Sequence, residues 1–437
     1  MNTTEVGTSA TAEPSPIVSR NVIGAAVGTL TEYYDFAIYG LVAPAIATEF
    51  FPHGNPTTAT LSTFAIFALA FVTRPIGGVV FGYLGDRVGR KSVLAVSILL
   101  MAVSTAAIGV LPTYETVGLL APVLLLICRC LQSLSVGGEF SGASSYLAET
   151  VPAHKRGTYA SMVTAAAGLP FIFAIAIILP LSASLDDAAF NSWGWRVPFL
   201  LAAPLGLFGL YIRMKLEESA AFTELKASGS APRNPLLTGI RTQWRKMILV
   251  FCAAAVTASA YYIFSAYMVT YVTSTLHYGR DTALMINGVA TAFLCAGILL
   301  AGRASDRFGR RPVIATGLAG LVILGVPSFL LLQTGSTAAL LLGQTVFALC
   351  IAPVTAVVPT LASELFPTSV RYSCNALSYN LAYTVFGGTA PFIAAWLIST
   401  TSLKIAPAIY ASTIAFLGAI VILGRLKETR GTALHQI

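Results

Sequence analysis

Apolar runs of about twenty residues recur along this chain, and they constrain its fold more than any other feature. A helix that crosses a bilayer needs about 20 consecutive apolar residues. Of the 437 residues, 56% are hydrophobic and only 10% are charged, whereas a soluble domain carries roughly 25% charged residues. We therefore predict an all-α membrane protein with twelve transmembrane helices, at about 21–49, 59–84, 93–112, 118–143, 158–182, 196–214, 247–273, 283–302, 312–333, 338–362, 372–400 and 406–425.

The Lys and Arg residues fall almost entirely on one side of these predicted helices. Of the 26 in the chain, 21 lie on the side that also holds both termini, and three lie on the opposite side. The remaining two, Arg74 and Arg129, lie inside predicted helices. Because cytoplasmic loops of membrane proteins are enriched in Lys and Arg, we expect both termini in the cytoplasm. The net charge of +8 then reflects topology and does not indicate a nucleic-acid partner.

Cysteine and histidine are placed where they carry no catalytic or metal chemistry. The six cysteines all lie in apolar runs, and the four histidines lie in predicted loops or the tail. We predict no disulfide, no metal site and no cofactor. An enzyme is not expected, because a hydrolase within the membrane would need intramembrane His ligands or a nucleophile beside a base.

Two short segments repeat along the chain at nearly one spacing. GYLGDRVGRKSV at 82–93 matches GRASDRFGRRPV at 302–313, an offset of 220 residues, and ETVPAHKR at 149–156 matches ELFPTSVR at 364–371, an offset of 215. We therefore expect two six-helix halves, an arrangement used by transporters with a midplane site between the halves. The predicted divisions are a cytoplasmic N-terminal segment (1–20), an N-terminal half (21–214), a cytoplasmic linker (215–246), a C-terminal half (247–425) and a cytoplasmic tail (426–437).

These residues resemble a known family. The repeated G-x-x-x-D-R-x-G-R-[RK] segment is similar to the signature of the major facilitator superfamily. Further stretches resemble its metabolite:H+ symporter branch, which carries α-ketoglutarate, shikimate, citrate, proline and betaine: TEYYDFAIYG at 31–40 with FFP at 50–52, RPIGG at 74–78, CRCLQSLSVGGEF at 128–140, ETVPAHKRG from 149, and SYNLAYTVFGG at 378–388. The resemblance spans nearly the whole chain and implies a bacterial inner-membrane transporter.

Two features depart from particular members of the superfamily. Osmolyte carriers of this branch typically have a long C-terminal coiled-coil extension, whereas here about twelve residues follow the last predicted helix. Drug/proton antiporters of the superfamily have a Gly-Pro motif on the fifth helix, whereas here that region reads GLP at 168–170. Both departures make the osmolyte carriers with this extension and the drug/proton antiporters less favoured than other members of the superfamily.

Ionisable residues inside the predicted helices mark the candidate site, because each costs at least about 2.5–3.5 kcal/mol in a membrane. On the first helix, Glu32, Asp35 and Tyr39 are spaced three and four residues apart and share one face. On the fourth helix, Arg129 and Gln132 share a face near mid-membrane. The C-terminal half has no charged residue in the middle of a predicted helix, and offers Tyr261, Tyr262, Tyr267, Asn287, Gln344, Tyr379, Asn380 and Tyr383.

We expect the N-terminal half to handle protons and the C-terminal half to supply hydrogen bonds and aromatic walls. A carboxylate in a dry cavity favours its protonated form, and a nearby guanidinium favours its charged form. Asp35 and Glu32 are therefore the candidate proton-coupling residues, and an anionic substrate that took the Arg129 partner position would leave the acid free to bind a proton. The candidate substrate-binding residues are Arg129, Gln132, Tyr39, Arg74, Tyr379, Asn380 and Tyr383.

The repeated segment is predicted to be a cytoplasmic loop with a gating role. A helix N-terminus offers free N–H groups to a carboxylate such as Asp86, and the resemblance places that partner near Tyr372. Pairs of Arg90 with Glu149 and of Arg310 with Glu364 would hold the outward-open state. The candidate gating residues are Gly85, Asp86, Arg87, Gly89, Arg90, Glu139, Glu149, Arg156, Asp306, Arg307, Arg310, Glu364 and Arg371.

The sequence thus predicts a proton-coupled symporter that imports a small organic acid by alternating access and works as a monomer. Its expected partners are a small-molecule substrate, here a carboxylate, the proton and the lipid bilayer. Two alternatives stay open at this point. The substrate would instead be a zwitterionic osmolyte or amino acid of the proline and betaine type, or the protein would be an uncoupled facilitator.

Overall fold

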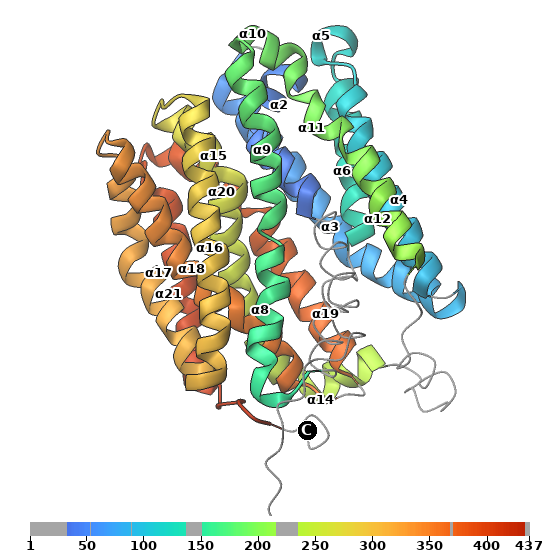
Figure 1. Cartoon of the computed structure of the whole chain (residues 1–437), viewed down its shortest axis with the longest axis vertical. Coiled ribbons are helices and arrows are strands. Elements are labelled where there is room, and N and C mark those ends of the chain that lie inside the picture. Colours follow the sequence, from blue (N-terminus) through green and yellow to red (C-terminus); the bar gives the residue numbers. More distant parts are fainter. Residues whose placement is uncertain are drawn as a thin grey trace, which may run out of the picture.

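A computed structural model describes residues 33–52, 54–88, 90–136, 151–215, 235–367 and 370–432, and these residues form a bundle of helices (Figure 1). Glu32, Gly89, Glu139 and Glu149 lie outside the described residues. The side chains of Asp86, Arg87 and Arg90 are not described either, although their backbone is helical, as is that of Gly85. The proton-coupling and gating roles predicted for these eight residues therefore stay predictions.

The N half, residues 33–215, begins with helical residues from Tyr33 that lead into α2 (Ala43–Phe50). Short α5 (Tyr114–Val117) and α10 (Asp187–Ala189) and a π-helical turn at Phe190–Gly194 cover one end of this half. The longer elements are α3 (Pro56–Val88), α4 (Arg90–Val110), α6 (Leu120–Val136), α8 (Arg156–Ala166) continued by α9 (Leu169–Ser184), and α11 (Arg196–Leu200) continued by α12 (Ala202–Lys215).

The C half comprises residues 235–425. Its members are α14 (Pro235–Tyr262), extended by π-helical turns at Ile263–Tyr267 and Tyr271–Thr275 around α15 (Met268–Thr270); α16 (Arg280–Phe308); α17 (Arg310–Leu332); α18 (Thr337–Leu365); α19 (Arg371–Ala382), joined by a π-helical turn at Tyr383–Gly388 to α20 (Ala390–Thr401); and α21 (Ala406–Arg425). Because α14 begins at Pro235, the last part of the predicted linker is helical.

The described helices coincide with the predicted spans. Nine are long and apolar enough to cross a membrane, and two shorter apolar helices, Ala95–Val110 and Leu120–Ser135, occupy the third and fourth predicted positions. The helical residues 33–50 occupy the first position, whose beginning lies outside the described part. The predicted helical membrane fold is therefore confirmed.

The repeated segments are helix ends, and the prediction that they form loops is wrong. The helix α3 continues to Val88, and α16 continues to Phe308. Only Gly309 separates α16 from α17, with φ of +106°. This left-handed backbone conformation favours glycine, so a tight reversal replaces the expected loop.

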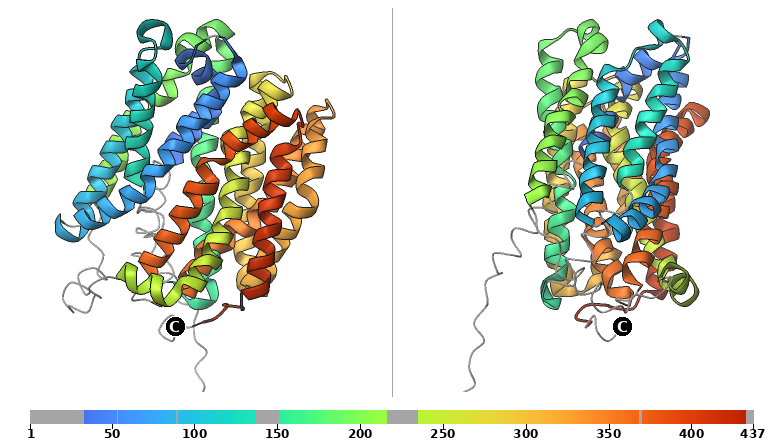
Figure 2. Two further views of the ribbon diagram at one scale, coloured as in Figure 1. Left: turned by 180° about the vertical axis from the view of Figure 1, so that it is seen from behind. Right: turned by 90° about the vertical axis from the view of Figure 1, so that its right-hand side faces the viewer.

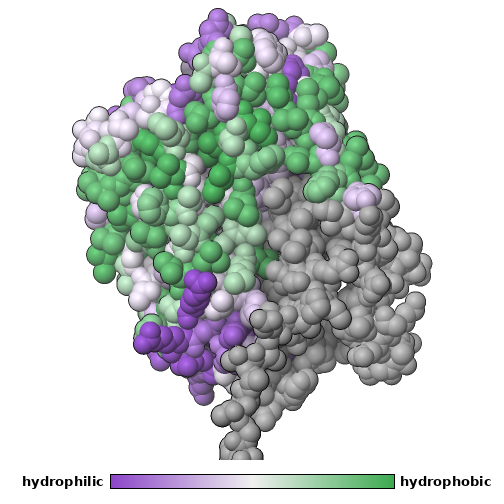
Figure 3. All heavy atoms as spheres, in the orientation of Figure 1, coloured by the Kyte–Doolittle hydropathy of each residue, from purple (hydrophilic) through white to green (hydrophobic). Residues whose placement is uncertain are grey.

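The two halves stand side by side and touch along two seams (Figures 1 and 2). In one seam α8 and α9 of the N half pack on α16, and α8 also packs on α18. In the other, α3 packs on α20 and on the π-helical turn at Tyr383–Gly388. Large apolar side chains such as Val79, Leu300 and Ile323 are more than half exposed, and Figure 3 shows a broad hydrophobic belt on the described surface. Such a belt is the surface expected of a chain that faces lipid.

Candidate functional site

Asp35 and Arg129 form an ion pair in the core of the N half. Asp35 lies on the helical segment before α2, and Arg129 lies in α6. The Arg129 Nη1 atom is 3.4 Å from Asp35 Oδ2, and each residue is only 1% exposed. The same Nη1 donates to Gln132 Oε1 at 2.9 Å. The structure thus brings together the acid, the arginine and the amide that the helix spacing singled out.

Hydrogen bonds extend from this pair toward α4. Gln132 Nε2 donates to Thr105 Oγ1 at 2.7 Å, and Thr105 Oγ1 donates to the carbonyl oxygen of Met101 at 2.8 Å. Thr105 was not predicted, because a lone threonine in an apolar helix gives no sequence signal. Among the described residues, Arg129 Nε and Nη2 have no hydrogen-bond acceptor. One carboxylate and one amide therefore hold this guanidinium by hydrogen bonds, and aromatic rings supply the rest of its surroundings.

Three aromatic rings surround the Arg129 guanidinium. Its Cζ atom lies 4.4 Å from the ring centroid of Tyr39, 5.2 Å from that of Phe67 and 5.3 Å from that of Phe36. A guanidinium within about 6 Å of a ring centroid gains cation–π attraction. The Tyr39 hydroxyl donates to the carbonyl oxygen of Thr63 at 2.8 Å. The predicted substrate contact of Tyr39 has no support in this geometry, because its ring covers Arg129 and its hydroxyl bonds to backbone.

Arg74 joins the two halves. From α3, its Nε donates to Asn380 Oδ1 on α19 at 3.2 Å. Its Cζ lies 5.6 Å from the ring centroid of Tyr383 and 5.8 Å from that of Phe71. The Tyr379 and Tyr383 rings stack with centroids 4.1 Å apart. Four residues of the predicted substrate site therefore meet here, at the seam between the halves.

A cavity between the halves is lined by residues of both. Its wall contains tyrosine rings, threonine hydroxyls and small apolar groups, contributed by Tyr33, Thr164, Ala167, Thr257, Tyr261, Thr355, Val358, Pro359, Tyr379 and Tyr383. No charged side chain lies on this wall among the described residues. Of the predicted substrate-binding residues, only Tyr379 and Tyr383 line the cavity. The threonines and Tyr33 were missed, because periodicity does not show which face of a buried helix meets a cavity.

Asp35 faces a different cavity, which lies within the N half. Tyr34, Met101 and Thr105 also line this second cavity, together with Ala102, Ala202 and Leu205. The aromatic rings of Phe36 and Phe67, which cover Arg129, contact Tyr262 of the C half. The acid and arginine are therefore separated from the cavity between the halves by aromatic side chains.

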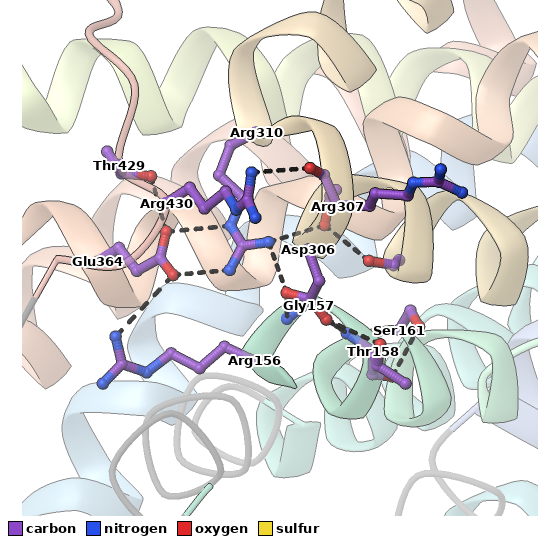
Figure 4. Close-up of polar contacts among 12 residues, drawn as sticks. Arg156, Gly157, Thr158, Ser161, Asp306, Arg307, Arg310, Glu364, Thr429 and Arg430 are labelled. Carbon is purple, nitrogen blue, oxygen red and sulfur yellow. Dashed lines mark hydrogen bonds and ion pairs between the residues drawn. The ribbon is translucent and has the colours of Figure 1, made fainter. Parts of the chain in front are cut away.

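In the second repeated segment, 302–313, Asp306 caps the start of α8 (Figure 4). Its carboxylate accepts hydrogen bonds from the backbone N–H groups of Gly157 at 2.9 Å and Thr158 at 2.7 Å, and from Thr158 Oγ1 at 2.7 Å. An acidic group is favoured at a helix N-terminus, where free N–H groups and the helix dipole attract it. Asp306 comes from the C half and α8 from the N half, so this contact ties the halves together. The prediction of a helix N-terminus as partner concerned Asp86, whose side chain is not described; Asp306, its counterpart in the second repeat, makes a contact of this kind.

Arg310 and Glu364 form the predicted ion pair at the same end of the bundle. Arg310 Nη2 is 2.9 Å from Glu364 Oε1 and Arg310 Nε is 3.2 Å from Oε2, a two-pronged arrangement that suits a guanidinium. Arg310 Nη1 also donates to Asp306 Oδ1 at 2.7 Å, and Arg156 Nη1 lies 4.0 Å from Glu364 Oε1. We call this end, defined by Asp306, Arg310, Glu364 and the start of α8, the motif end.

Two further predicted gating residues, Arg371 and Arg307, form hydrogen bonds with backbone or side-chain groups of other residues. Arg371 is buried at the start of α19, and its Nε donates to the carbonyl oxygen of Phe366 at 3.2 Å. The carbonyl oxygen of Arg307 accepts a hydrogen bond from Arg430 Nη1 at 2.7 Å.

The segment after α21 returns to the motif end and was not predicted to do so. Glu428 Oε1 accepts from the backbone N–H of Arg310 at 2.8 Å, and Thr429 Oγ1 donates to Glu364 Oε2 at 2.6 Å. Arg156 Nη1 donates to the carbonyl oxygen of Thr432 at 2.9 Å. Partial burial by itself would raise the pKa of Glu428, but the backbone N–H groups that it accepts from hold that pKa below its usual value.

A helical bundle in two halves, with a cavity between them and ionisable residues buried within the membrane, defines a secondary transporter. The family described as "Sugar (and other) transporter" matches residues 21–234 and 224–437. The chain belongs to this family. The resemblance to the major facilitator superfamily is thereby confirmed, and the protein is a multi-pass membrane transporter and not an enzyme.

The chain is similar to proteins named as transporters of proline and betaine. The chain is 35% identical over 418 residues to the proline/betaine transporter of Escherichia coli K12. The alignment covers 93% of this chain and 83% of that protein. The chain is also 36% identical over 421 residues to the glycine betaine/proline/ectoine/pipecolic acid transporter OusA of Dickeya dadantii, with the same coverage. Among solved structures, the proton:xylose symporter XylE bound to 6-bromo-6-deoxy-D-glucose matches with a TM-score of 0.75 at 20% identity, over 97% of this chain and 98% of that one. That structural likeness concerns the fold.

Proposed function

We propose that the protein is a proton-coupled transporter that imports a small zwitterion with a cationic nitrogen and a carboxylate, such as proline or betaine. The observation that carries the proposal is the cavity between the halves, which has several tyrosine rings and hydroxyl groups on its wall and no charged side chain among the described residues. Tyrosine faces attract secondary and quaternary ammonium groups through cation–π interactions. The names of the relatives agree with this chemistry.

The zwitterion alternative fits these observations better than the organic acid that the sequence placed first. A desolvated anion needs a fixed cation or several hydrogen-bond donors. The rings of Phe36 and Phe67 separate Arg129 from the cavity between the halves, and Arg129 is paired with Asp35. Arg74, which contacts Tyr383 and Asn380 at the seam, is better placed to meet the single carboxylate of a zwitterion bound among the tyrosines.

Asp35 is the proposed proton carrier. It is buried and paired with a guanidinium that cannot lose its own proton under physiological conditions. Proton binding to Asp35 would therefore cancel the charge of one partner and leave Arg129 held by Gln132 and the aromatic rings. Because the acid faces a cavity separate from the tyrosine-lined one, direct competition of substrate with Asp35 for Arg129, the mechanism expected from the sequence, is not part of this proposal.

The energetics of coupling distinguish the two substrate classes. A membrane potential contributes about 2.3 kcal/mol per charge per 100 mV, and one pH unit contributes about 1.4 kcal/mol. A zwitterion carried with one proton uses both terms, roughly 3.7 kcal/mol, or several hundred-fold accumulation. A monoanion carried with one proton is electroneutral and gains only the pH term, about tenfold.

We further propose that the motif end faces the cytoplasm and that its contacts close that side of the transporter. The charge distribution supports this orientation, because the described Arg156, Arg307, Arg310 and Arg430 all lie at this end. The Asp306 contact with α8 would then hold the outward-facing state and break as the halves reorient.

The test is uptake by the purified protein reconstituted in vesicles. Proline, betaine, α-ketoglutarate and shikimate would be compared with an imposed pH gradient, an imposed potential, both or neither. We expect accumulation of proline or betaine that responds to both gradients. Accumulation of a carboxylic acid alone would restore the organic-acid reading, and equilibration without accumulation under every gradient would establish an uncoupled facilitator. Protein-free vesicles provide the control for leakage.

A further inference from the structure

Tyr262, the last residue of α14, lies between the Asp35–Arg129 pair, called here the proton pair, and the tyrosine-lined cavity. It is fully buried. Its ring contacts Phe36, Phe67 and Phe71 of the N half, with centroids 6.3, 5.8 and 5.4 Å away and interplanar angles of 71°, 64° and 88°. These are edge-to-face arrangements, which aromatic pairs favour. A residue of the C half thus packs on one side against rings of the N half.

The N-half rings that Tyr262 contacts are those that rest on the buried arginines. Phe36 and Phe67 lie 5.3 and 5.2 Å from Arg129 Cζ, and Phe71 lies 5.8 Å from Arg74 Cζ. Any change in the position of the Arg129 guanidinium therefore affects Phe36 and Phe67, together with Tyr39, whose ring centroid lies 4.4 Å from Arg129 Cζ. Both rings are almost fully buried and cannot move without displacing a neighbour, since protein interiors are closely packed.

On its other side Tyr262 contacts two rings of the cavity wall. Its centroid lies 5.7 Å from that of Tyr261 and 6.1 Å from that of Tyr383, again edge to face. Both of these tyrosines line the cavity proposed to hold substrate. One aromatic route from the Asp35–Arg129 pair to that cavity therefore passes from Phe36 or Phe67 through Tyr262 to these two tyrosines of the C half. A second route stays within the N half, from Phe36 to Tyr33, whose ring centroid lies 6.5 Å away and which also lines the cavity.

The backbone around this ring is both tight and irregular. A Cβ atom on Gly387 would lie 3.0 Å from the Tyr262 ring, and one on Gly388 would lie 2.5 Å from the Phe71 ring. Tyr262 is followed by the π-helical turn at Ile263–Tyr267, and Tyr383 begins another at Tyr383–Gly388. Single π-helical turns within α-helices are frequent at functional sites. The ring therefore has no free space beside it, and the segments that carry it and Tyr383 are places where a helix can change register.

We propose that Tyr262 couples the two sites: its ring transmits the protonation state of the Asp35–Arg129 pair to the tyrosines of the substrate cavity. When Asp35 is charged, it draws Arg129 by direct pairing; when Asp35 is protonated, Arg129 depends more on the faces of Phe36, Tyr39 and Phe67. The resulting shift of Phe36 and Phe67 moves Tyr262 and with it Tyr261 and Tyr383. Tyr262 acts as a positioning residue and touches neither proton nor substrate. This inference rests on the proposed function, in which Asp35 carries the proton.

The test compares two measurements on full-length protein in vesicles with radiolabelled proline and betaine. Net accumulation under a pH gradient requires coupling, whereas exchange of labelled for unlabelled substrate at equal pH does not. We expect Tyr262→Leu to lower pH-driven accumulation about tenfold, the share supplied by one pH unit, and to lower exchange far less. Tyr262→Phe keeps the ring and is expected to restore accumulation. Tyr262→Leu with wild-type accumulation would overturn the proposal.

Tyr271→Leu is the matched control. Tyr271 is also a buried tyrosine beyond α14, but its ring packs on Phe329 within the C half, 5.2 Å between centroids, and its hydroxyl bonds to the carbonyl oxygen of Lys404. It contacts neither Arg129 nor the cavity wall. We expect it to lower accumulation and exchange together, if at all. A selective loss of accumulation in this control equal to that of Tyr262→Leu would also overturn the proposal.

A binding measurement separates this proposal from the proposed function itself. Linkage requires that coupled substrate and proton sites alter each other's affinity by the same factor. The affinity of purified protein for proline or betaine, measured by thermal shift at several pH values, is expected to lose its pH dependence in both Asp35→Asn and Tyr262→Leu. Loss of pH dependence in Asp35→Asn alone would overturn the role of Tyr262 only, and no loss in either would overturn the proton assignment as well.

A second variant approaches the same contact from the N half, for the case in which Tyr262→Leu does not fold. Phe67→Leu removes the ring that touches both Arg129 and Tyr262. We expect the pH dependence of substrate binding to fall in this variant. Wild-type pH dependence in Phe67→Leu would overturn the proposal.

Discussion

The two halves place different chemistry at corresponding positions. Arg129 and Gln344 are separated by 215 residues, the offset at which one repeated segment recurs, and Phe67 and Asn287 by 220, the offset of the other. In the N half Arg129 Cζ lies 5.2 Å from the Phe67 ring. In the C half Asn287 Nδ2 donates to Gln344 Oε1 at 3.4 Å. The same pair of positions is in contact in both halves, once as a cation on a ring and once as two amides.

The difference shows that the N half holds a buried charged pair at these positions, whereas the C half holds a neutral one. All three polar members, Arg129, Asn287 and Gln344, are buried. A buried charge costs far more than a buried amide unless it is paired, and only Arg129 has a carboxylate beside it. The C half uses its amides for structure, since Asn287 Nδ2 also donates to the carbonyl oxygen of Phe264 in a π-helical turn at 3.2 Å. A shared scaffold therefore holds a charged pair where we propose proton binding and neutral groups elsewhere.

The largest effect is expected when Arg129 of the N half is replaced by glutamine, the residue type at the corresponding position of the C half. Arg129→Gln leaves Asp35 buried without its cation, and breaking a buried pair in this way costs about 3–5 kcal/mol. Denaturation of the purified protein in detergent would measure the loss. Adding Asp35→Asn should recover more than half of it. A single variant as stable as the wild type would mean that the pair contributes nothing to folding.

The next effect concerns transport. Asp35→Asn keeps the shape of the acid and removes its titration, so accumulation driven by one pH unit is expected to fall about tenfold. Exchange at equal pH should persist. Uptake by vesicles with and without a pH gradient would measure both. Full pH-driven accumulation by this variant would remove Asp35 from the coupling step.

A smaller effect is expected from the amide pair. Asn287→Leu leaves the Phe264 carbonyl oxygen and Gln344 without their donor, which costs about 1–3 kcal/mol. The double variant with Gln344→Leu should be closer to the wild type, because both partners are then apolar. Denaturation gives the stabilities, and vesicle uptake should show unchanged pH coupling. Loss of coupling here would contradict the division of roles between the halves.

The smallest effect is expected at the motif end. Because backbone N–H groups hold the pKa of Glu428 below its usual value, its contribution to stability is present above pH 4.5 and is lost as the pH falls through the lower folded-state value. Glu428→Gln should therefore lower the melting temperature slightly at pH 7, with the difference from wild type narrowing toward pH 4. A difference that stays constant over this range would show that the charge is not involved.

Much of the fold was predictable, because the length of each apolar run predicts a membrane helix and the repeated segments indicate two halves. Asp35, Arg129 and Gln132 were placed together correctly from helix spacing and depth. Tyr39 was assigned to the substrate because it shares a face with Asp35, but spacing cannot tell whether that face meets a cavity or a neighbouring ring. The π-helical turns were not predicted, since no residue pattern specifies where a helix admits an extra residue.

The segment 428–432 was missed for a related reason. Its residues carry no helical periodicity, and the contacts of Glu428 with Arg310 and of Thr429 with Glu364 depend on where α21 ends relative to α17. Only the packed bundle sets that position. A short polar stretch after a membrane helix is read from sequence as a tail, although here it completes an ion-pair network.

This returning segment also sets an order of events during biosynthesis. A growing chain leaves the ribosome from its N-terminus at about 5–20 residues per second, so α8, α16 and α18 are made before residues 428–432. The Asp306 cap on α8 can form once α16 has been inserted, but the hydrogen bonds from Thr429 to Glu364 and from Arg156 to Thr432 must wait for the segment after α21. The nascent transporter therefore passes through a stage in which both halves are inserted while the join between them is still incomplete.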